Sequence, residues 1–395
     1  MTKRIAGSHA KVQAADEMRL GNEKTAALDP AAPRQRALPD GSRPVTIASV
    51  TQTGNDFATL KRLLMQRGLF EKQPRYYAVK MLLTCSLLVL SLTFLILVQQ
   101  WWLHLLNAVF LAFVSTQLGL LGHDAGHRQI FRRTWNNDCV SLITGNFLLG
   151  MSHGWWIEKH NQHHSHPNQQ DLDPDIDIPV LAFSSEHLPR SGKLRLFLVK
   201  YQATFFFPIL LLASVNLKFY SVLFLLQRKE KYHSVEVALL LGHYLAYLGL
   251  LFWCLPAWQA VLFIVIHQGL TGLYLGSIFA PNHKGMPVLD KDSSLDFLHR
   301  QVETARNVKS HPFTDFWYGG LNYQIEHHLF PSMPRNNLRE AQCIIKPFCQ
   351  ARARPYHETS WLQSYQEILH HLHAVSAPLR VVSSRSENTG NRMEL

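Results

Sequence analysis

The sequence predicts an all-α integral membrane protein, with two transmembrane helical hairpins and a cytoplasmic helical cap. Three observations predict this fold class. Apolar blocks of about 20 residues, each enough for a helix to cross roughly 30 Å of hydrocarbon, occur as two pairs. The link within each pair is uncharged and flanked by tryptophan, whereas the outer ends of the pairs meet Lys and Arg. Histidines gather where the apolar blocks end.

Three domains are expected along the chain. Residues 1–55 have no sustained apolar period, which predicts a disordered cytoplasmic tail. Residues 56–372 form the membrane domain, in which 57–77 interleave leucines with Lys and Arg and predict an amphipathic approach to the membrane. Residues 373–395 predict a loose polar tail. Hydrophobic residues at 47% and charged residues at 17% exclude a disordered chain and argue against a soluble enzyme.

The four predicted spans are 81–98 with 101–121, and 235–254 with 257–279. Basic residues follow the first pair, precede the second and follow it, and positive charge favours the cytoplasmic side. Both hairpins therefore open toward the cytoplasm, and both termini are expected there.

The apolar block 201–227 is long enough to span but contains Pro208, Asn216 and Lys218. If it crossed once, the histidines near residue 160 and those near 327 would lie on opposite faces. A site shared by these histidines therefore predicts that the block is interfacial or re-entrant.

The first histidine cluster follows the second apolar block. His123 and His127 are spaced i, i+4, so on a helix they share a face about one turn apart. This spacing suits two imidazoles at one metal, although interfacial histidines that bind lipid head groups give the same pattern. Asp124 stands where a zinc protease motif needs Glu, so that motif is not matched.

The second cluster is His160, His163 and His164, spaced i, i+3, i+4 on one helical face. Packing does not require three polar rings in a row, so a metal site is the better interpretation. His153 and His166 flank this cluster and are expected to be surface or supporting residues.

The third cluster repeats the spacing with Gln324, His327 and His328. A neutral amide is a poor ligand beside imidazole, so Gln324 is expected to support a ligand by hydrogen bonding, with direct ligation the alternative. Glu326 lies on the helical face away from these three residues and is expected to be solvated or salt-bridged.

One further ligand is expected at the end of the fourth apolar block. His283 lies at the membrane depth of His123, and Asn282 beside it is a possible supporting residue. His267 lies deeper in the same block and is the alternative ligand.

The expected ligands are eight imidazoles, too many for one metal and suited to two. Imidazole suits Fe, Zn, Cu or Ni, and O₂ activation by iron is the chemistry that a long apolar substrate at a bilayer favours. The eight are His123, His127, His160, His163, His164, His283, His327 and His328.

The motifs HDAGH, HNQHH and QIEHH, in this order around two hairpins, resemble those of the membrane-bound fatty acid desaturases. The longer strings KHNQHHSHPNQQDLDPDI (159–176) and GGLNYQIEHHLFPSMPR (319–335) resemble the bacterial, especially actinobacterial, acyl-CoA or acyl-lipid desaturases. A QxxHH third motif is shared with the front-end and linoleoyl-CoA-type branch.

This resemblance implies a di-iron centre held by histidines on the cytoplasmic face, in the bacterial inner membrane. It implies O₂-dependent removal of two hydrogens from an acyl chain, giving a cis double bond and water. Because the sequence shows no HPGG haem motif, nucleotide fingerprint or iron–sulfur cysteine set, we expect two electrons from a separate ferredoxin or reductase. Carboxylates, namely Asp124, Asp171, Asp173 and Asp175, are candidates to orient the histidines, although the DLDPDI run also fits a solvated turn.

Two other functions are open. A lipid or alkyl hydroxylase on the same scaffold is the nearest alternative, because it differs only in the fate of the substrate radical. A His-rich transporter is less favoured, because the four spans have almost no ionisable residues at their midplane.

Overall fold

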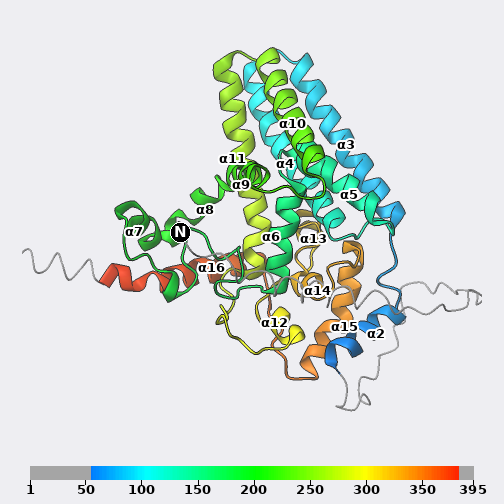
Figure 1. Cartoon of the computed structure of the whole chain (residues 1–395), viewed down its shortest axis with the longest axis vertical. Coiled ribbons are helices and arrows are strands. Elements are labelled where there is room, and N and C mark those ends of the chain that lie inside the picture. The colour runs from blue at the N-terminus through cyan, green and yellow to red at the C-terminus, as the bar shows by residue number, and fades with distance from the viewer. Residues whose placement is uncertain (1–54, 382–395) are drawn as a thin grey trace, which may run out of the picture. The chain divides into compact units, whose positions relative to one another are not determined.

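The computed structural model describes residues 55–381 as helices and one small parallel sheet (Figure 1). The helices before the second hairpin are α2 Asp56–Gln66, α3 Pro74–Leu97, α4 Trp101–Gly126, α5 Thr134–Leu142, the π-helix η1 Ile143–Leu149, α6 His153–Ser165, the 3₁₀ turn η2 Ser185–His187, α7 Lys193–Lys200, α8 Gln202–Leu210 and α9 Ala213–Gln227. The remaining elements are α10 His233–Cys254, α11 Ala257–His283, α12 Phe297–Glu303, β1 Asn307–Val308, α13 Pro312–Trp317, α14 Gln324–Leu329, η3 Arg335–Asn337, α15 Leu338–Gln350, β2 Glu358–Thr359 and α16 Trp361–Val375.

Four helices, α3, α4, α10 and α11, are long and apolar enough to cross a membrane, as the sequence predicts. Several extend past the predicted bounds: α3 begins at Pro74, α4 ends at Gly126 and α11 ends at His283. Because α4 and α11 continue beyond their apolar stretches, they carry His123 and His283 out of the apolar part of the bundle.

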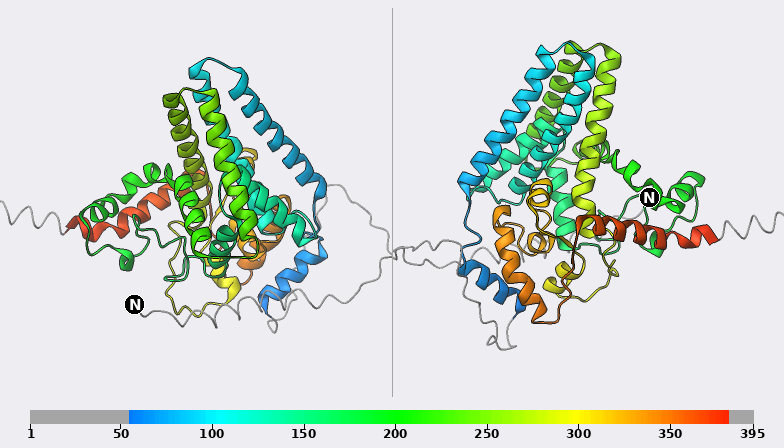
Figure 2. Two further views of the ribbon diagram at one scale, coloured as in Figure 1. Left: turned by 45° about the horizontal axis from the view of Figure 1, so that its top comes forward. Right: turned by 180° about the vertical axis from the view of Figure 1, so that it is seen from behind.

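The four long helices form one bundle, and most other helices gather at one end of it (Figures 1 and 2). The α4 helix is central, since it packs against both α3 and α11. At the far end of the bundle Leu95, Ala108, Leu251 and Phe263 form a buried apolar cluster. Outer faces remain apolar, and Leu97 is 72% exposed, as a lipid-facing side chain would be.

The block 201–227 is a bent helix pair: α8 and α9 meet at an angle of 68°. The bend packs on Gly272 of α11, where a Cβ would lie 2.7 Å from the carbonyl oxygen of Leu210. Gly272 precedes His283 by 11 residues, or about 16 Å of helix. The pair therefore reaches well along the bundle without forming one straight span.

The cap buries the apolar face of α2. Leu60 and Leu64 are fully buried in a cluster with Ile345 and Phe348 of α15. The interpretation of residues 57–77 as an amphipathic approach to the membrane is therefore wrong for α2, because its leucines pack on protein.

A buried arginine joins the cap to the bundle. Arg306 donates from Nε to the carbonyl oxygen of Pro281 at 2.7 Å and from Nη1 to Oε2 of Glu367 at 2.6 Å. Its Nη2 donates to the carbonyl oxygen of Lys284 at 2.8 Å. The end of α11 is thereby fixed to α16.

The predicted N-terminal tail lies, apart from Asn55, outside the described residues. Asn55 caps α2, since its Oδ1 accepts from the backbone N–H of Phe57. At the C-terminal end the packed structure continues past residue 372, where the loose tail is predicted to begin. Helix α16 ends at Val375, and Arg380 donates to the carbonyl oxygen of Lys200 at 3.3 Å. Residues 382–395 lie outside the description.

Candidate metal centre

The end of α4 supplies the first two histidines. The helix continues through Gly126, so the rings of His123 and His127 lie one turn apart, with centroids 4.7 Å from each other. Gly126 leaves room for Trp156, since a Cβ there would lie 2.2 Å from that indole.

The α6 helix supplies three more. Its first turn is capped by Ser152, whose hydroxyl accepts from the backbone N–H of Trp155 at 3.1 Å. His160 and His164 then lie against His127 at the end of α4, whereas His163 lies against His283, with ring centroids 4.6 Å apart. The Trp156 indole stacks on His160 at 4.5 Å between ring centroids.

The short helix α14 carries His327 and His328, and both are buried. His283 at the end of α11 completes the set. The structure thus brings together all eight imidazoles that the sequence singles out, although His123 and His328 are 205 positions apart in the chain.

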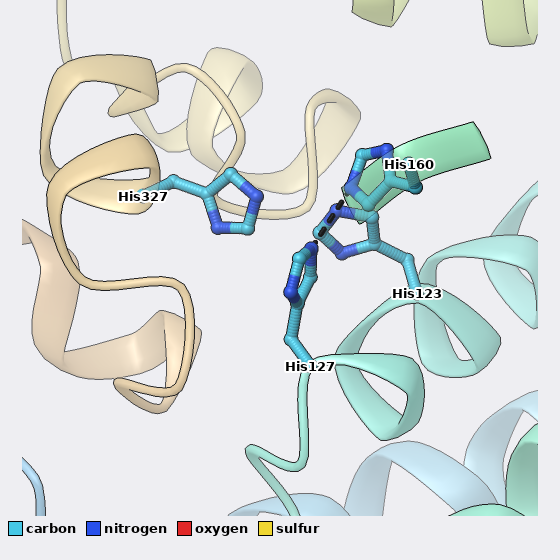
Figure 3. Close-up of side chains that lie close together, drawn as sticks. All are labelled: His123, His127, His160 and His327. Atoms are coloured by element: carbon cyan, nitrogen blue, oxygen red, sulfur yellow. Dashed lines mark hydrogen bonds between the residues drawn. The ribbon is translucent and has the colours of Figure 1, made fainter. Parts of the chain in front are cut away.

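Two groups of ring nitrogens are evident. His123, His127, His160 and His327 offer nitrogens that all lie within 4.8 Å of one another, and Figure 3 shows the four rings facing a common centre. His163, His283 and His328 form the second group within the same limit. His164 lies between them: its Nε2 is 3.1 Å from His160 Nε2, and its ring stacks on His328.

In the second group, hydrogen bonds at the Nδ1 atoms fix the tautomer of each histidine. His163 Nδ1 lies 3.0 Å from the Asp173 carboxylate, and His283 Nδ1 lies 2.9 Å from the carbonyl oxygen of Thr304. His328 Nδ1 lies 2.9 Å from Gln301 Oε1. A carboxylate and carbonyl oxygens only accept, so each Nδ1 carries the proton and each Nε2 presents a lone pair inward.

The inward nitrogens are arranged as cation ligands. His283 Nε2 lies 2.9 Å from His328 Nε2, and His127 Nε2 lies 2.8 Å from His160 Nε2. His123 Nε2 and both ring nitrogens of His327 are buried without a hydrogen-bond partner among residues 55–381. The facing lone pairs of His283 and His328 repel each other and orphaned buried nitrogens are costly, and bound metal ions would relieve both. The residues therefore fit two imidazole-ligated metals.

Burial favours the neutral form of His160, His164 and His328. It lowers the pKa of His160 well below the usual value, and the neighbouring imidazoles His127 and His123 lower it further. The pKa of His164 and that of His328 are lowered well below the usual value for the same reasons. Neutral imidazole is the form that ligates metals.

Gln324 and Asp124 lie beside candidate ligands, and Asn282 reaches them through Gln324. Gln324 Nε2 lies 2.9 Å from His283 Nε2, and its Oε1 accepts from Asn282 Nδ2 at 2.9 Å. Asp124 Oδ1 lies 3.4 Å from His123 Nδ1, and Asp124 Oδ2 pairs with Arg335 Nε at 2.9 Å. That ion pair links the first histidine motif to the segment after the third.

The carboxylates of the DLDPDI run differ from one another. Asp173 is buried against His163, and Asp175 forms an ion pair with Lys159 and lies 3.6 Å from His163 Nδ1. Asp171 is exposed and faces Lys291 instead. The run is therefore partly a support for the histidines and partly a solvated turn.

The alternative ligand His267 and the expectation for Glu326 do not hold. His267 is remote from the centre: its Nε2 lies 3.0 Å from Ser115 Oγ and its Nδ1 lies 2.7 Å from the Tyr247 hydroxyl. Glu326 is neither solvated nor salt-bridged, because it is fully buried and accepts from Asn307 Nδ2 and the Tyr356 hydroxyl at 2.6 Å each. Burial raises the pKa of Glu326 to about 7.

Sequence reasoning missed Gln301, Thr304 and Arg335. Gln301 also donates to the carbonyl oxygen of His164 at 2.7 Å, so it binds two histidine-bearing helices. These residues carry no local spacing signal, because their roles depend on contacts with distant parts of the chain.

A cavity of about 1140 Å³ adjoins the histidines. Its exposed polar lining includes Asp177 and Arg228, and its lining reaches Leu95 and Leu251 at the far end of the bundle. The cavity wall is mostly apolar, although polar side chains such as Lys218 and Gln268 also line it, and its reach along the bundle suits a long amphiphile.

Comparison with known proteins gives consistent matches. A family model described as fatty acid desaturase matches residues 100–360. An acyl-lipid (9-3)-desaturase of Physcomitrium patens is 33% identical over 316 residues, which are 77% of this chain and 59% of that protein. A Delta(8)-fatty-acid desaturase of Euglena gracilis is 33% identical over 324 residues, 78% of this chain and 76% of the relative. A Delta(6)-fatty-acid desaturase of Caenorhabditis elegans is 32% identical over 336 residues, 81% of this chain and 75% of the relative.

Proposed function

The chain belongs to the fatty acid desaturase family, and on that premise we propose that it introduces a cis double bond into a long acyl chain. The overall reaction takes up O₂, two electrons and two protons, removes two hydrogens from adjacent methylenes, and releases two waters. The observation that carries the proposal is the pair of histidine groups beside an apolar cavity that extends along the bundle.

The eight histidines would hold two iron ions, one in each group, with His164 between them. Iron bound there would supply O₂ activation and hydrogen abstraction from an unactivated chain. Asp173, Thr304 and Gln301 keep His163, His283 and His328 in the tautomer that ligates through Nε2. Gln324 Nε2 lies 2.9 Å from His283 Nε2, so its amide stands beside the position that the metal would take, and Asn282 Nδ2 donates to its Oε1.

The cavity would hold the acyl chain and exclude water from the reacting methylenes. His123, His160 and His163 line it, and Leu111 lines it 12 residues before His123, or about 18 Å further along α4. Most of the apolar wall therefore lies beyond the histidines, which supports a double bond nearer the carboxyl than the methyl end. Relatives named for Delta(6) and Delta(8) positions support the same choice.

Topology and partners complete the proposal. The histidine end and the cap face the cytoplasm of a bacterial inner membrane, since basic residues flank the inner ends of the hairpins. Electrons arrive from a separate ferredoxin or reductase, and a net charge of +11 suits an acidic donor. The acyl chain is carried as a CoA thioester or a lipid ester, as in the bacterial type.

The test is expression in a bacterium with a compatible ferredoxin and reductase, with saturated and mono-unsaturated acids supplied. Total fatty acids are read by gas chromatography–mass spectrometry. We expect a new unsaturated acid that is lost in His163→Ala and retained in His370→Ala, an exposed histidine outside the centre. A hydroxy acid instead would move the function to the hydroxylase alternative.

A further inference from the structure

The α7 helix presents apolar side chains to its surroundings. Leu194 is 71% exposed and Phe197 is 49% exposed, and Val199 is the one buried residue of the helix. Tyr201, directly after the helix, is also exposed. The spacing i, i+3, i+7 places these three side chains on one face. In water such a stripe would expose hydrocarbon without compensation.

Cations flank this stripe on both sides. By helical rotation Lys193 and Lys200 lie on one side of it and Arg195 on the other. Within residues 55–381 none of the three forms an ion pair: Arg195 donates from Nε to the carbonyl oxygen of Pro179, and Lys200 lies over the Tyr201 ring. An apolar stripe between unpaired cations is typical of a helix lying in a membrane interface.

The stripe continues into the membrane part of the molecule. The Phe197 ring contacts Phe205 of α8, with centroids 5.6 Å apart. The α8–α9 bend, which packs on α11 at Gly272, exposes Leu212 and Val215. Figures 1 and 2 show α7 and α8 projecting sideways from the bundle, with α16 along their side away from its far end. The outward apolar surface therefore runs from the bundle to α7.

We propose that α7 lies in the cytoplasmic interface of the membrane and binds anionic phospholipid head groups through Lys193, Arg195 and Lys200. Leu194 and Phe197 then insert among the acyl chains. Arg195 donates to the carbonyl oxygen of Pro179, which lines the cavity, so the interfacial helix would lie beside this part of the cavity wall. The proposal depends on the membrane location and not on the reaction.

The test measures the surroundings of α7 in the full chain. Native cysteines other than the buried Cys349 are replaced by serine, and a single cysteine at Leu194 or, separately, Phe197 carries an NBD fluorophore. The protein is reconstituted in phosphatidylcholine vesicles with or without phosphatidylglycerol. Labels at Met65 in α2 and Leu90 in α3, both exposed, report water and lipid respectively.

We expect labels at 194 and 197 to resemble the label at 90: blue-shifted emission, quenching by spin-labelled lipid and protection from iodide. Phosphatidylglycerol should strengthen this protection, and Lys193→Gln with Lys200→Gln should abolish that increase. Iodide quenching equal to that at 65 in both vesicles would overturn the interfacial location. A phosphatidylglycerol response unchanged in the double variant would overturn the recognition of anionic lipid.

Discussion

The buried pair of Asp124 and Arg335 gives the sharpest prediction about how the metal centre is held. Asp124 is 2% exposed and Arg335 is 6% exposed, with Oδ2 and Nε 2.9 Å apart. Arg335→Met leaves the Asp124 carboxylate buried without its cation, which costs about 3–5 kcal/mol. For a chain of this size that lowers the Tm by on the order of 10 °C. Because Asp124 contacts His123, we also expect less iron per chain.

The assay is thermal unfolding in detergent together with iron determination on purified protein. Arg352→Met is the matched control, since Arg352 pairs with the more exposed Asp56 at 2.8 Å and should cost less than about 1 kcal/mol. Asp124→Asn combined with Arg335→Met should recover part of the loss, because no unpaired charge remains. A Tm for Arg335→Met equal to that of Arg352→Met would refute the reasoning.

Three further predictions concern other parts of the fold. Burial raises the pKa of Glu326 from 4.5 to about 7, so its contribution to the free energy of unfolding is present below pH 4.5 and is lost, by up to about 3 kcal/mol, as the pH rises through 7. Glu326→Gln should therefore gain in Tm relative to the parent between pH 5 and 8, and a constant difference would contradict this. Gly272→Ala should lower the Tm by the equivalent of about 1–3 kcal/mol, because its Cβ would press on the Leu210 carbonyl, whereas Gly249→Ala, with open space around it, should not destabilise. His283→Gln should lose bound iron while His267→Gln keeps it, as measured by metal analysis; equal iron in both would show that His283 is not a ligand.

Local spacing made most of the candidate site predictable. The i, i+3, i+4 pattern places His160, His163 and His164 on one helical face whatever surrounds the helix. The structure, however, divides that face: His160 joins His127 and His327, whereas His163 joins His283 and His328. Which neighbours each ring meets depends on how α6 sits against α4, α11 and α14, and no spacing within one helix contains that information.

Glu326 and α2 show where sequence reasoning fails. A carboxylate on the helical face away from the histidines is expected to contact water. Glu326 instead accepts hydrogen bonds from Asn307 and Tyr356, which lie 19 and 30 positions away in the chain. The leucines of α2 suit a membrane surface or a protein surface equally, and the presence of α15 decides between them. Both outcomes depend on long-range packing.

The sequence by itself determined the four apolar helices, because their length and hydrophobicity are local properties matched to a bilayer. It also singled out the eight imidazoles, seven of them by motifs with helical-turn spacing and His283 by its place at the end of the fourth apolar block. Only the tertiary structure decided how these imidazoles divide into two groups, which residues fix their tautomers, and where Asp124 finds its cation, 211 positions later at Arg335. The physical reason is that hydrogen bonds and ion pairs act over a few ångströms in space, and the distance between their partners along the chain is set by folding alone.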